Sequence, residues 1–319
     1  MTQATTVGAP DVADAARDAF HEGERAVQAR AGVRERMAQL GPRVFRDYMP
    51  EQHRQFFAQL PFLVVGSVDE QRQPWATVLA GPPGFVASPT ERRLTIRAAP
   101  LAGSPLRPPV AGMPVGLLGI EPHTRRRNRM NGHVDKVDAA GFEVVVDQSF
   151  GNCPRYIQAR KPEYLAERAG RSVTPIHRAA GLDEAARELI GRSDTFFIAS
   201  AHPTSGVDVS HRGGRPGFVR VLADSALVAP DFAGNSFFNT LGNLCVDPRA
   251  GLLFLDFDSG DCLYLAATAT IVWEGAQVAA FPGAQRLLRF EIRQSVRAEA
   301  GLPLRWGLAE SSPSLPQAC

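Results

Sequence analysis

The apolar positions of this chain fall in short runs that end in small or turn-forming residues. Phe62–Val65 and Phe196–Ile198 are two such runs, and both are rich in aromatic and β-branched side chains. Runs of the same kind recur at 94–96, 115–120, 142–146, 218–221, 252–257 and 263–272. Strand-sized segments at this close spacing, separated by glycine and proline, predict small antiparallel β-barrels.

The sequence also repeats itself once. Residues 61–86 align with residues 194–219 at a constant offset of 133, which places the tetrapeptide PGFV at 83–86 opposite PGFV at 216–219. A second block, 115–121, matches 250–256 at an offset of 135. This period is far too long for a solenoid, so the chain is predicted to hold two copies of one β domain.

Helices are predicted mainly at the edges of these domains. The local patterns indicate one or two helices within 11–40, a short helix at 50–60, a helix at 162–169 that ends before Gly170, and a helix at 182–190. The prediction is a mainly β chain with peripheral helices. Its parts are an N-terminal helical segment at 1–49, a first barrel at 50–160, a helical connection at 161–190, a second barrel at 191–308 and a flexible tail at 309–319.

Composition and charge narrow the function. The 35 basic and 33 acidic side chains give a formal net charge of +2, too small an excess for sequence-independent binding of nucleic acid. The N-terminus lacks the pattern of a secretory leader, and no apolar run nears the roughly 18 residues of a membrane span. Four widely spaced cysteines encode neither a zinc site nor a disulfide framework. We expect a cytoplasmic protein without a metal, a membrane or a nucleic-acid partner.

A polar cluster in the second copy suits a phosphate ester. Ser210, His211, Arg212 and Gly213 lie together at the start of a predicted strand. Arginine can bind a phosphate through two parallel hydrogen bonds, and glycine lets backbone N–H groups approach it. The alternative is an ordinary turn whose polar side chains face water.

A second polar cluster follows in the same copy. The apolar residues within 237–244 recur at the spacing of a helix with one packed face, which leaves Asn239, Thr240 and Asn243 away from that face. Their amide and hydroxyl groups could hydrogen-bond a ligand. Alternatively, the asparagine and serine side chains of this segment only cap the helix.

The first copy carries an alternating run of arginines. Arg125, Arg127 and Arg129 stand at every second position, so in a strand their side chains would point the same way. This pattern is typical of a solvated edge strand whose charges discourage sheet pairing. It is equally compatible with an anion site.

A further candidate segment, 149–157, follows the predicted strand at 142–146. Asn152 or Cys153 as the cap, with Pro154 at the first helical position, predicts the start of a helix. A helix N-terminus accepts anions or carbonyl groups and lowers the pKa of an exposed cysteine. Cys153 is therefore either a plain capping residue or a reactive thiol.

Three stretches of the second copy, SHRGGRPGFVRV, FNTLGN and DPRAGLLF, resemble the pyridoxamine 5'-phosphate oxidase-like proteins, the FMN-binding split barrels. The likeness covers about 190–275 and extends through the repeat to 55–135. The stretch QSFGNCPRYIQ is similar to the segment that closes the first barrel in two-barrel members. The resemblance implies a six-stranded antiparallel barrel in each copy, with FMN in the groove between the two barrels.

The resemblance also implies which residues hold the cofactor. The phosphate or ribityl end would lie against the second barrel, and the first barrel would approach the flavin ring. The implied residues are Ser210, His211, Arg212, Gly213, Asn239, Thr240 and Asn243 from the second barrel, and Ser149, Asn152 and Arg155 from the first. No catalytic residue is assigned, because the chemistry would be that of the cofactor.

The implied function is that of an FMN-dependent oxidoreductase. Hydride would pass through flavin N5 to or from an undefined small molecule, with NAD(P)H as a candidate donor. The alternatives are a flavin carrier without turnover and an interaction module with an empty groove. The tandem could act as a monomeric pseudo-dimer, or two chains could form a homodimer.

The sequence departs from the pyridoxamine phosphate oxidases themselves at two places. The lysines that bind the FMN phosphate in those enzymes have no counterpart at 219–221 or 239–240. The segment 302–306 also lacks their C-terminal substrate motif. Oxidation of pyridoxamine phosphate is therefore not expected.

Overall fold

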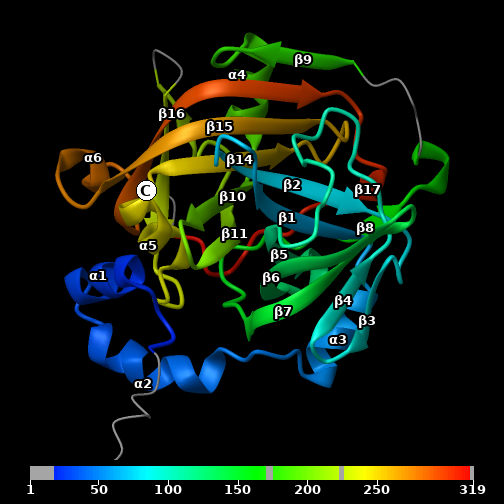
Figure 1. Ribbon diagram of the computed structural model, residues 1–319. Coiled ribbons are helices and arrows are strands. Elements are labelled where there is room, and N and C mark those ends of the chain that lie inside the picture. Colours follow the sequence, from blue (N-terminus) through cyan, green and yellow to red (C-terminus); the bar gives the residue numbers. More distant parts are fainter. Residues whose placement is uncertain (1–17, 170–174, 223–225, 317–319) are drawn as a thin grey trace, which may run out of the picture.

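Two large antiparallel sheets with helices at their periphery form the protein (Figure 1). The computed structural model describes residues 18–169, 175–222 and 226–316. The chain is mainly β, and the prediction of two tandem split barrels with peripheral helices is confirmed.

The first sheet has seven strands in the order β2-β1-β5-β6-β7-β4-β3. Neighbouring strands along this path are antiparallel. The strands are β1 (Phe62–Val68), β2 (Pro74–Ala80), β3 (Val86–Thr90), β4 (Arg93–Ile96), β5 (Pro114–Glu121), β6 (Arg126–Asp138) and β7 (Gly141–Gly151).

The second sheet follows the same path, β11-β10-β14-β15-β16-β13-β12, and β9 pairs with β16 as an eighth strand. Each sheet thus exceeds the six strands implied by the resemblance, because hydrogen bonding continues to the short edge strands β3 and β12. The strands are β9 (Ile176–Ala179), β10 (Thr195–His202), β11 (Gly206–Gly213), β12 (Arg220–Val221), β13 (Ala226–Phe232), β14 (Arg249–Leu255), β15 (Cys262–Val272) and β16 (Ala284–Ala298).

The helices surround the sheets (Figure 1). His21 and Glu24 form a reciprocal capping box at the start of α1, and Asp183 caps α4 by accepting from the Ala186 N–H at 2.8 Å. Among the described residues, no helix has the length and apolar character that a membrane crossing requires. The helices are α1 (Glu22–Arg30), α2 (Arg34–Val44), α3 (Glu51–Ala58), α4 (Glu184–Arg192), α5 (Asn239–Val246), α6 (Ala276–Ala279) and the 3-10 turns η1 (Pro122–Thr124) and η2 (Ala166–Arg168).

The strand pairing confirms the internal repeat. Val65 pairs with Leu117 in the first sheet, and Ile198 pairs with Leu252 in the second, at positions related by the offsets 133 and 135. Both sheets shift register at the same place, between residues 131 and 132 of β6 and between 266 and 267 of β15. The copies therefore share strand order, register and a β-bulge.

The two sheets pack closely against each other, with β5 against β11 and β14 against β2. This reciprocal pairing is expected for two copies related by an approximate two-fold axis. Glycine permits the approach, since a Cβ on Gly116 would lie 2.5 Å from the Val207 carbonyl oxygen, and a Cβ on Gly251 only 2.2 Å from that of Pro74. Buried side chains from both copies form a joint core around these contacts.

Most of the helices predicted at the edges of the two domains are found, and the one predicted at 162–169 is wrong. The segment 11–40 contains α1 and most of α2, the segment 50–60 contains α3, and the segment 182–190 contains most of α4. Residues 1–17 and Gly170 lie outside the described residues. The helix predicted at 162–169 is replaced by β8 (Pro162–Tyr164), which pairs with β17 (Leu304–Trp306). The Leu165 N–H also donates to the Pro303 carbonyl, so only the turn η2 is helical there.

Two smaller expectations need correction. The strand predicted at 218–221 is reduced to β12, because the Phe218 N–H closes a turn with the Arg215 carbonyl. The predicted tail at 309–319 is described as far as residue 316, and it is held in place there. Ala159 and Glu310 exchange two backbone hydrogen bonds of 2.8 Å, and Ser312 is buried.

The close approach at Gly251 can be tested by adding one methyl group. Gly251→Ala should lower the free energy of unfolding by about 1–3 kcal/mol, as overpacking does elsewhere, because the new Cβ would clash with the Pro74 backbone. Gly191→Ala is the control: Gly191 is exposed on α4 with no atom within 4 Å of an added Cβ, so this variant should be as stable as the parent or more so. Urea unfolding measures both, and an unchanged midpoint for Gly251→Ala would contradict the packing.

Candidate functional site

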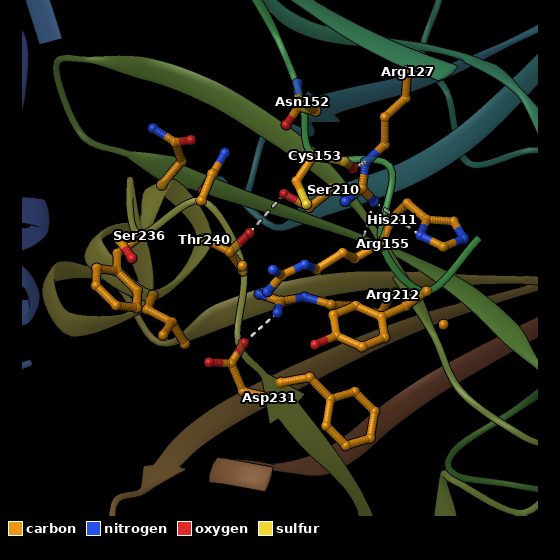
Figure 2. A pocket seen from close by; sticks show the side chains of 18 of the residues that line it. Arg127, Asn152, Cys153, Arg155, Ser210, His211, Arg212, Asp231, Ser236 and Thr240 are labelled. Carbon is orange, nitrogen blue, oxygen red and sulfur yellow. Dashed lines mark hydrogen bonds and ion pairs between the residues drawn. The ribbon is translucent and has the colours of Figure 1, made fainter. Parts of the chain in front are cut away.

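A pocket of about 110 Å³ opens between the two sheets, with walls from both copies (Figure 2). The first copy contributes β5, β6 and the loop after β7. The second copy contributes β11, the end of β13, and the segment that leads into α5. The polar residues of the lining are Arg127, Arg129, Asn152, Cys153, Arg155, Tyr156, Ser210, His211, Arg212, Asp231, Asn235, Ser236, Asn239 and Thr240.

The structure brings together eight of the ten residues predicted to hold the cofactor. They come from three separate segments: the end of β11, the first turn of α5 and the loop after β7. These eight residues are Ser210, His211, Arg212, Gly213, Asn239, Thr240, Asn152 and Arg155.

The other two predicted residues lie outside the pocket lining. Asn243 donates from Nδ2 to Ser200 Oγ at 3.1 Å and to Asp208 Oδ2 at 2.9 Å, between α5 and the second sheet. Ser149 is fully buried in β7, and its Oγ lies 3.2 Å from Nδ1 of His53 on α3. Both side chains are used in packing one element against another.

The loop after β7 is not the predicted helix start. Residues 152–154 have no regular structure, and Tyr156 adopts a left-handed backbone with φ of 66°, which interrupts a helical path. The Cys153 carbonyl accepts from Arg127 Nε at 2.7 Å, so a distant side chain fixes this loop. The argument for a thiol activated by a helix N-terminus is therefore lost, although Cys153 does line the pocket.

Arg129 crosses the boundary between the copies. Its strand, β6, lies inside the first sheet between β5 and β7, so the solvated edge-strand interpretation is wrong. Arg129 Nη1 lies 2.9 Å from Asp208 Oδ1 and donates to Asn239 Oδ1 at 3.0 Å, while Nη2 donates to Ser210 Oγ. All three partners belong to the second copy. Arg125, which precedes β6, does not line the pocket.

Arg127 is a partly buried cation that none of the described carboxylates neutralises. Its Nη1 lies 3.0 Å from His211 Nδ1, which must accept because a guanidinium only donates. Burial, together with the nearby charges of Arg129 and Arg212, lowers the pKa of Arg127 to about 10. Burial and the charges of Arg127 and Arg212 also hold the pKa of His211 well below its usual value. At neutral pH Arg127 is therefore charged and His211 is neutral.

The pocket carries an excess of positive charge. Four arginines line it: Arg127, Arg129, Arg155 and Arg212. Asp231 pairs with Arg212 and, outside the lining, with Arg286, whose Nε lies 3.6 Å from Asp231 Oδ2, and Asp208 pairs with Arg129 from behind the wall. No described carboxylate forms an ion pair with Arg127 or Arg155, so the four lining arginines and these two aspartates leave a formal excess of +2.

Buried donors without acceptors accompany this charge. Arg129 Nε, Arg212 Nε and Asn152 Nδ2 are buried, and none of them has a hydrogen-bond partner among the described residues. Native proteins rarely leave buried donors unsatisfied. All three belong to residues of the pocket lining, so an anion with several oxygens is the ligand that suits the site.

A hydrogen-bond chain links the N-terminal helix to this site. Glu24 on α1 accepts from Asn239 Nδ2, and Asn239 Oδ1 accepts from Arg129. Burial, and then the charge of Asp208, raises the pKa of Glu24 to about 8. Glu24 is thus mainly protonated at neutral pH and does not offset the positive charge of the pocket.

A cluster of His21, Glu22 and His202 could at first sight hold a metal, since its ligand atoms lie within 4.8 Å of one another. Each histidine accepts a backbone N–H bond at Nδ1, from the residue two positions later in the chain. The proton of each neutral ring is therefore on Nε2, the nitrogen that would have to bind the metal. His202 Nε2 instead donates to Glu22 at 2.8 Å.

The side chains of the pocket suit the binding of an anion better than the transfer of a proton. The pKa of His211 is lowered, and burial raises the pKa of Tyr156, so neither group titrates near neutrality. Sequence alternation did single out Arg127 and Arg129 without assigning them to this site. Nothing in the sequence marked Asp231 or Glu24, because both act through partners far along the chain.

No protein-family model and no curated protein matches the chain. Among solved structures, it is similar to a candidate pyridoxamine 5'-phosphate oxidase of Lactobacillus delbrueckii (17% identity, 37% of this chain, 94% of that chain, TM-score 0.31). It is also similar to an FAD-binding protein of Mesorhizobium loti (9%, 40% and 98%, TM-score 0.28). A third is the heme storage protein HutZ of Vibrio cholerae (12%, 37% and 95%, TM-score 0.28).

The raised pKa of Glu24 predicts a pH dependence of stability. The pKa of Glu24 is about 8 in the folded state and near its ordinary 4.5 in the unfolded state, so the folded state binds the proton more tightly. The stability that this proton contributes is therefore fully present below about pH 4.5 and is lost as the pH rises toward 8. Glu24→Gln, which mimics the protonated acid, should lose less stability between pH 5 and pH 8 than the parent. Urea midpoints across this range test this, with the exposed Glu35→Gln as control. Parallel curves for Glu24→Gln and the parent would contradict it.

Proposed function

We propose that this protein binds flavin mononucleotide in the pocket between its two sheets and grips it by the phosphate. The main support is that Arg127 and Arg155 have no carboxylate partner among the described residues and lie beside buried hydrogen-bond donors that lack acceptors. A phosphate monoester carries close to two negative charges at neutral pH and presents three acceptor oxygens, which suits a formal excess of +2. A carboxylate would supply only half of that charge.

The donors of both copies would share the phosphate and the ribityl chain. Arg127 and Arg155 come from the first copy, and Arg212 with Ser210 and Thr240 from the second. Ser210 Oγ and Thr240 Oγ1 lie 2.8 Å apart, so this hydroxyl pair can both donate and accept toward a polyol. Figure 2 shows Arg155 and Arg212 reaching into the same space.

The size of the pocket supports the charged end as the anchor. Pockets that enclose a whole ligand of drug size measure roughly 300–1,000 Å³. The 110 Å³ here suits the phosphate and its neighbouring atoms. Tyr156 and Phe232, whose rings lie 5.1 Å apart, give the same pocket an aromatic side for the remainder of the cofactor.

We further propose that the protein with FMN bound is an oxidoreductase for a small molecule, with NAD(P)H as the candidate electron donor. FMN would supply hydride transfer, and the chain would supply position and charge. Arginines near the cofactor favour its negatively charged forms, because they lower the free energy of added electrons. No general acid from the protein is required for this role.

A flavin carrier without turnover remains the second candidate, and one observation favours it. His211 and Tyr156, two pocket groups that could exchange protons, have pKa values displaced away from neutrality by burial. A protein that only stores or delivers FMN needs the anion site and nothing else.

The binding proposal predicts a selective effect of removing Arg127. Arg127→Met should weaken FMN binding by about 10- to 150-fold, the equivalent of one charged hydrogen bond of roughly 1.5–3 kcal/mol. Arg305→Met is the matched control, because Arg305 is exposed, pairs with Glu163 and lies outside the pocket lining. Flavin fluorescence titration gives both constants, and circular dichroism checks that each variant is folded. If both variants bind FMN with equal affinity, the phosphate does not bind at Arg127 and the proposed site is wrong.

Oxidoreductase and carrier are separated by reduction of the bound flavin. With FMN bound, NADH or NADPH under anaerobic conditions should bleach the yellow colour of the flavin, and an added acceptor should restore it. Flavin that stays oxidised with both donors would favour the carrier.

A further inference from the structure

The repeat creates a second position where the same pocket could have formed. An approximate two-fold axis that exchanges the two copies sends β6 to β15 and β11 to β2, and the shared register fixes which residues correspond. Single-domain dimers built on such an axis carry two equivalent contact regions, called seams here. In this chain the first seam is the pocket region between β6 and β11, and the second seam is the equivalent region between β15 and β2. Each strand position of the first seam therefore has an equivalent position in the second seam.

The strand that grips the anion has an apolar counterpart. Ile198 pairs with Ser210 and Phe197 with His211, and at the equivalent positions Val65 pairs with Thr77 and Val64 with Val78. His211 is thus replaced by Val78, which is fully buried in the joint core. By the same register, Leu79 and Ala80 stand where the first seam has Arg212 and Gly213.

The arginines of β6 are also replaced. Ile120 pairs with Arg127, and the equivalent Leu255 pairs with Cys262, so Cys262 occupies the position of Arg127. Two residues further along, Tyr264 occupies the position of Arg129. Cys262 and Tyr264 are both 0% exposed, and Tyr264 is among the largest fully buried side chains. Where the first seam has two cations, the second has a thiol and an aromatic ring packed into the core.

The segments that frame the first seam have no polar counterpart in the second. The chain after β13 forms α5, which contributes Asn239 and Thr240, whereas the corresponding chain after β4, residues 97–113, forms no helix. That segment instead packs across the second seam, where a Cβ on Gly103 would come within 3.1 Å of the Ala298 Cβ. Leu302, beyond the end of β16, is fully buried in the same core.

We infer that each chain binds one phosphate-ester ligand and that each copy supplies a different part of this single site. The second copy supplies the groups of β11 and α5, and the first copy supplies the arginines of β6 and the loop after β7. The second seam is packed with buried side chains of the joint core and holds the two sheets together. This inference rests on the proposed function for the identity of the ligand, but not for the number of sites. A homodimer of this chain would accordingly bind two ligands, one in each chain.

Binding stoichiometry tests the inference directly. The full chain at a concentration well above the dissociation constant should bind one FMN, measured by equilibrium dialysis against protein quantified by amino-acid analysis. Two equivalent FMN molecules per chain would overturn it. If no FMN binds, inorganic phosphate replaces it as the probe: one phosphate per chain contradicts the flavin and supports the single site, whereas two per chain, or none, overturns the single site.

A pair of variants at equivalent positions assigns the site to one seam. Arg129→Leu should weaken binding of FMN at least tenfold, whereas Tyr264→Phe, at the reciprocal position, should change its affinity less than twofold. Because Arg129→Leu also leaves Asp208 unpaired, Arg155→Met serves as the second variant if the first does not fold, since Arg155 is exposed and has no described ion pair. A larger loss of FMN affinity for Tyr264→Phe than for the arginine variants would place the ligand in the second seam and overturn the assignment.

Discussion

The rest of the structure depends on the close backbone contact between the two sheets. At Gly116 and Gly251 the strands approach so closely that a single methyl group would overlap a carbonyl oxygen of the other copy. This distance determines how far the side chains of β6 must reach to meet β11. Arg129 spans it and finds all its partners in the second copy, so the joint core and the pocket are consequences of one packing geometry.

Charge in this contact region is distributed unevenly. Asp208 receives hydrogen bonds from Arg129, Asn131 and Asn243, which makes it a buried centre with several partners. Arg127 has no carboxylate partner among the described residues, and its lowered pKa reflects the cost of keeping that charge between two sheets. A cation that stays charged under those conditions is destabilising, and a bound anion would reduce that cost.

The two copies keep the same topology but differ in what they place at their seams. One seam holds arginine, histidine and hydroxyl groups, and the other holds valine, cysteine and a buried tyrosine. A single polypeptide can make this change, whereas a dimer of identical chains must repeat every residue on both sides. The N-terminal helix α1 adds to the asymmetry, because Glu24 contacts Asn239 beside the polar seam.

The sequence by itself determined the strands that form apolar runs, the repeat, most of the helices and the polar cluster at 210–213, because these follow from local periodicity and from comparison of one copy with the other. It did not predict β2, β13 or β16. Only the tertiary structure decided which polar residues meet. Asn243 and Ser149 bond to Asp208 and His53 instead of facing the pocket, and Pro162–Tyr164 is a strand because β17, some 140 residues later, pairs with it. Hydrogen bonds and ion pairs between distant segments leave no local periodic signal, so the charge excess around Arg127 could be seen only once the two copies were packed together.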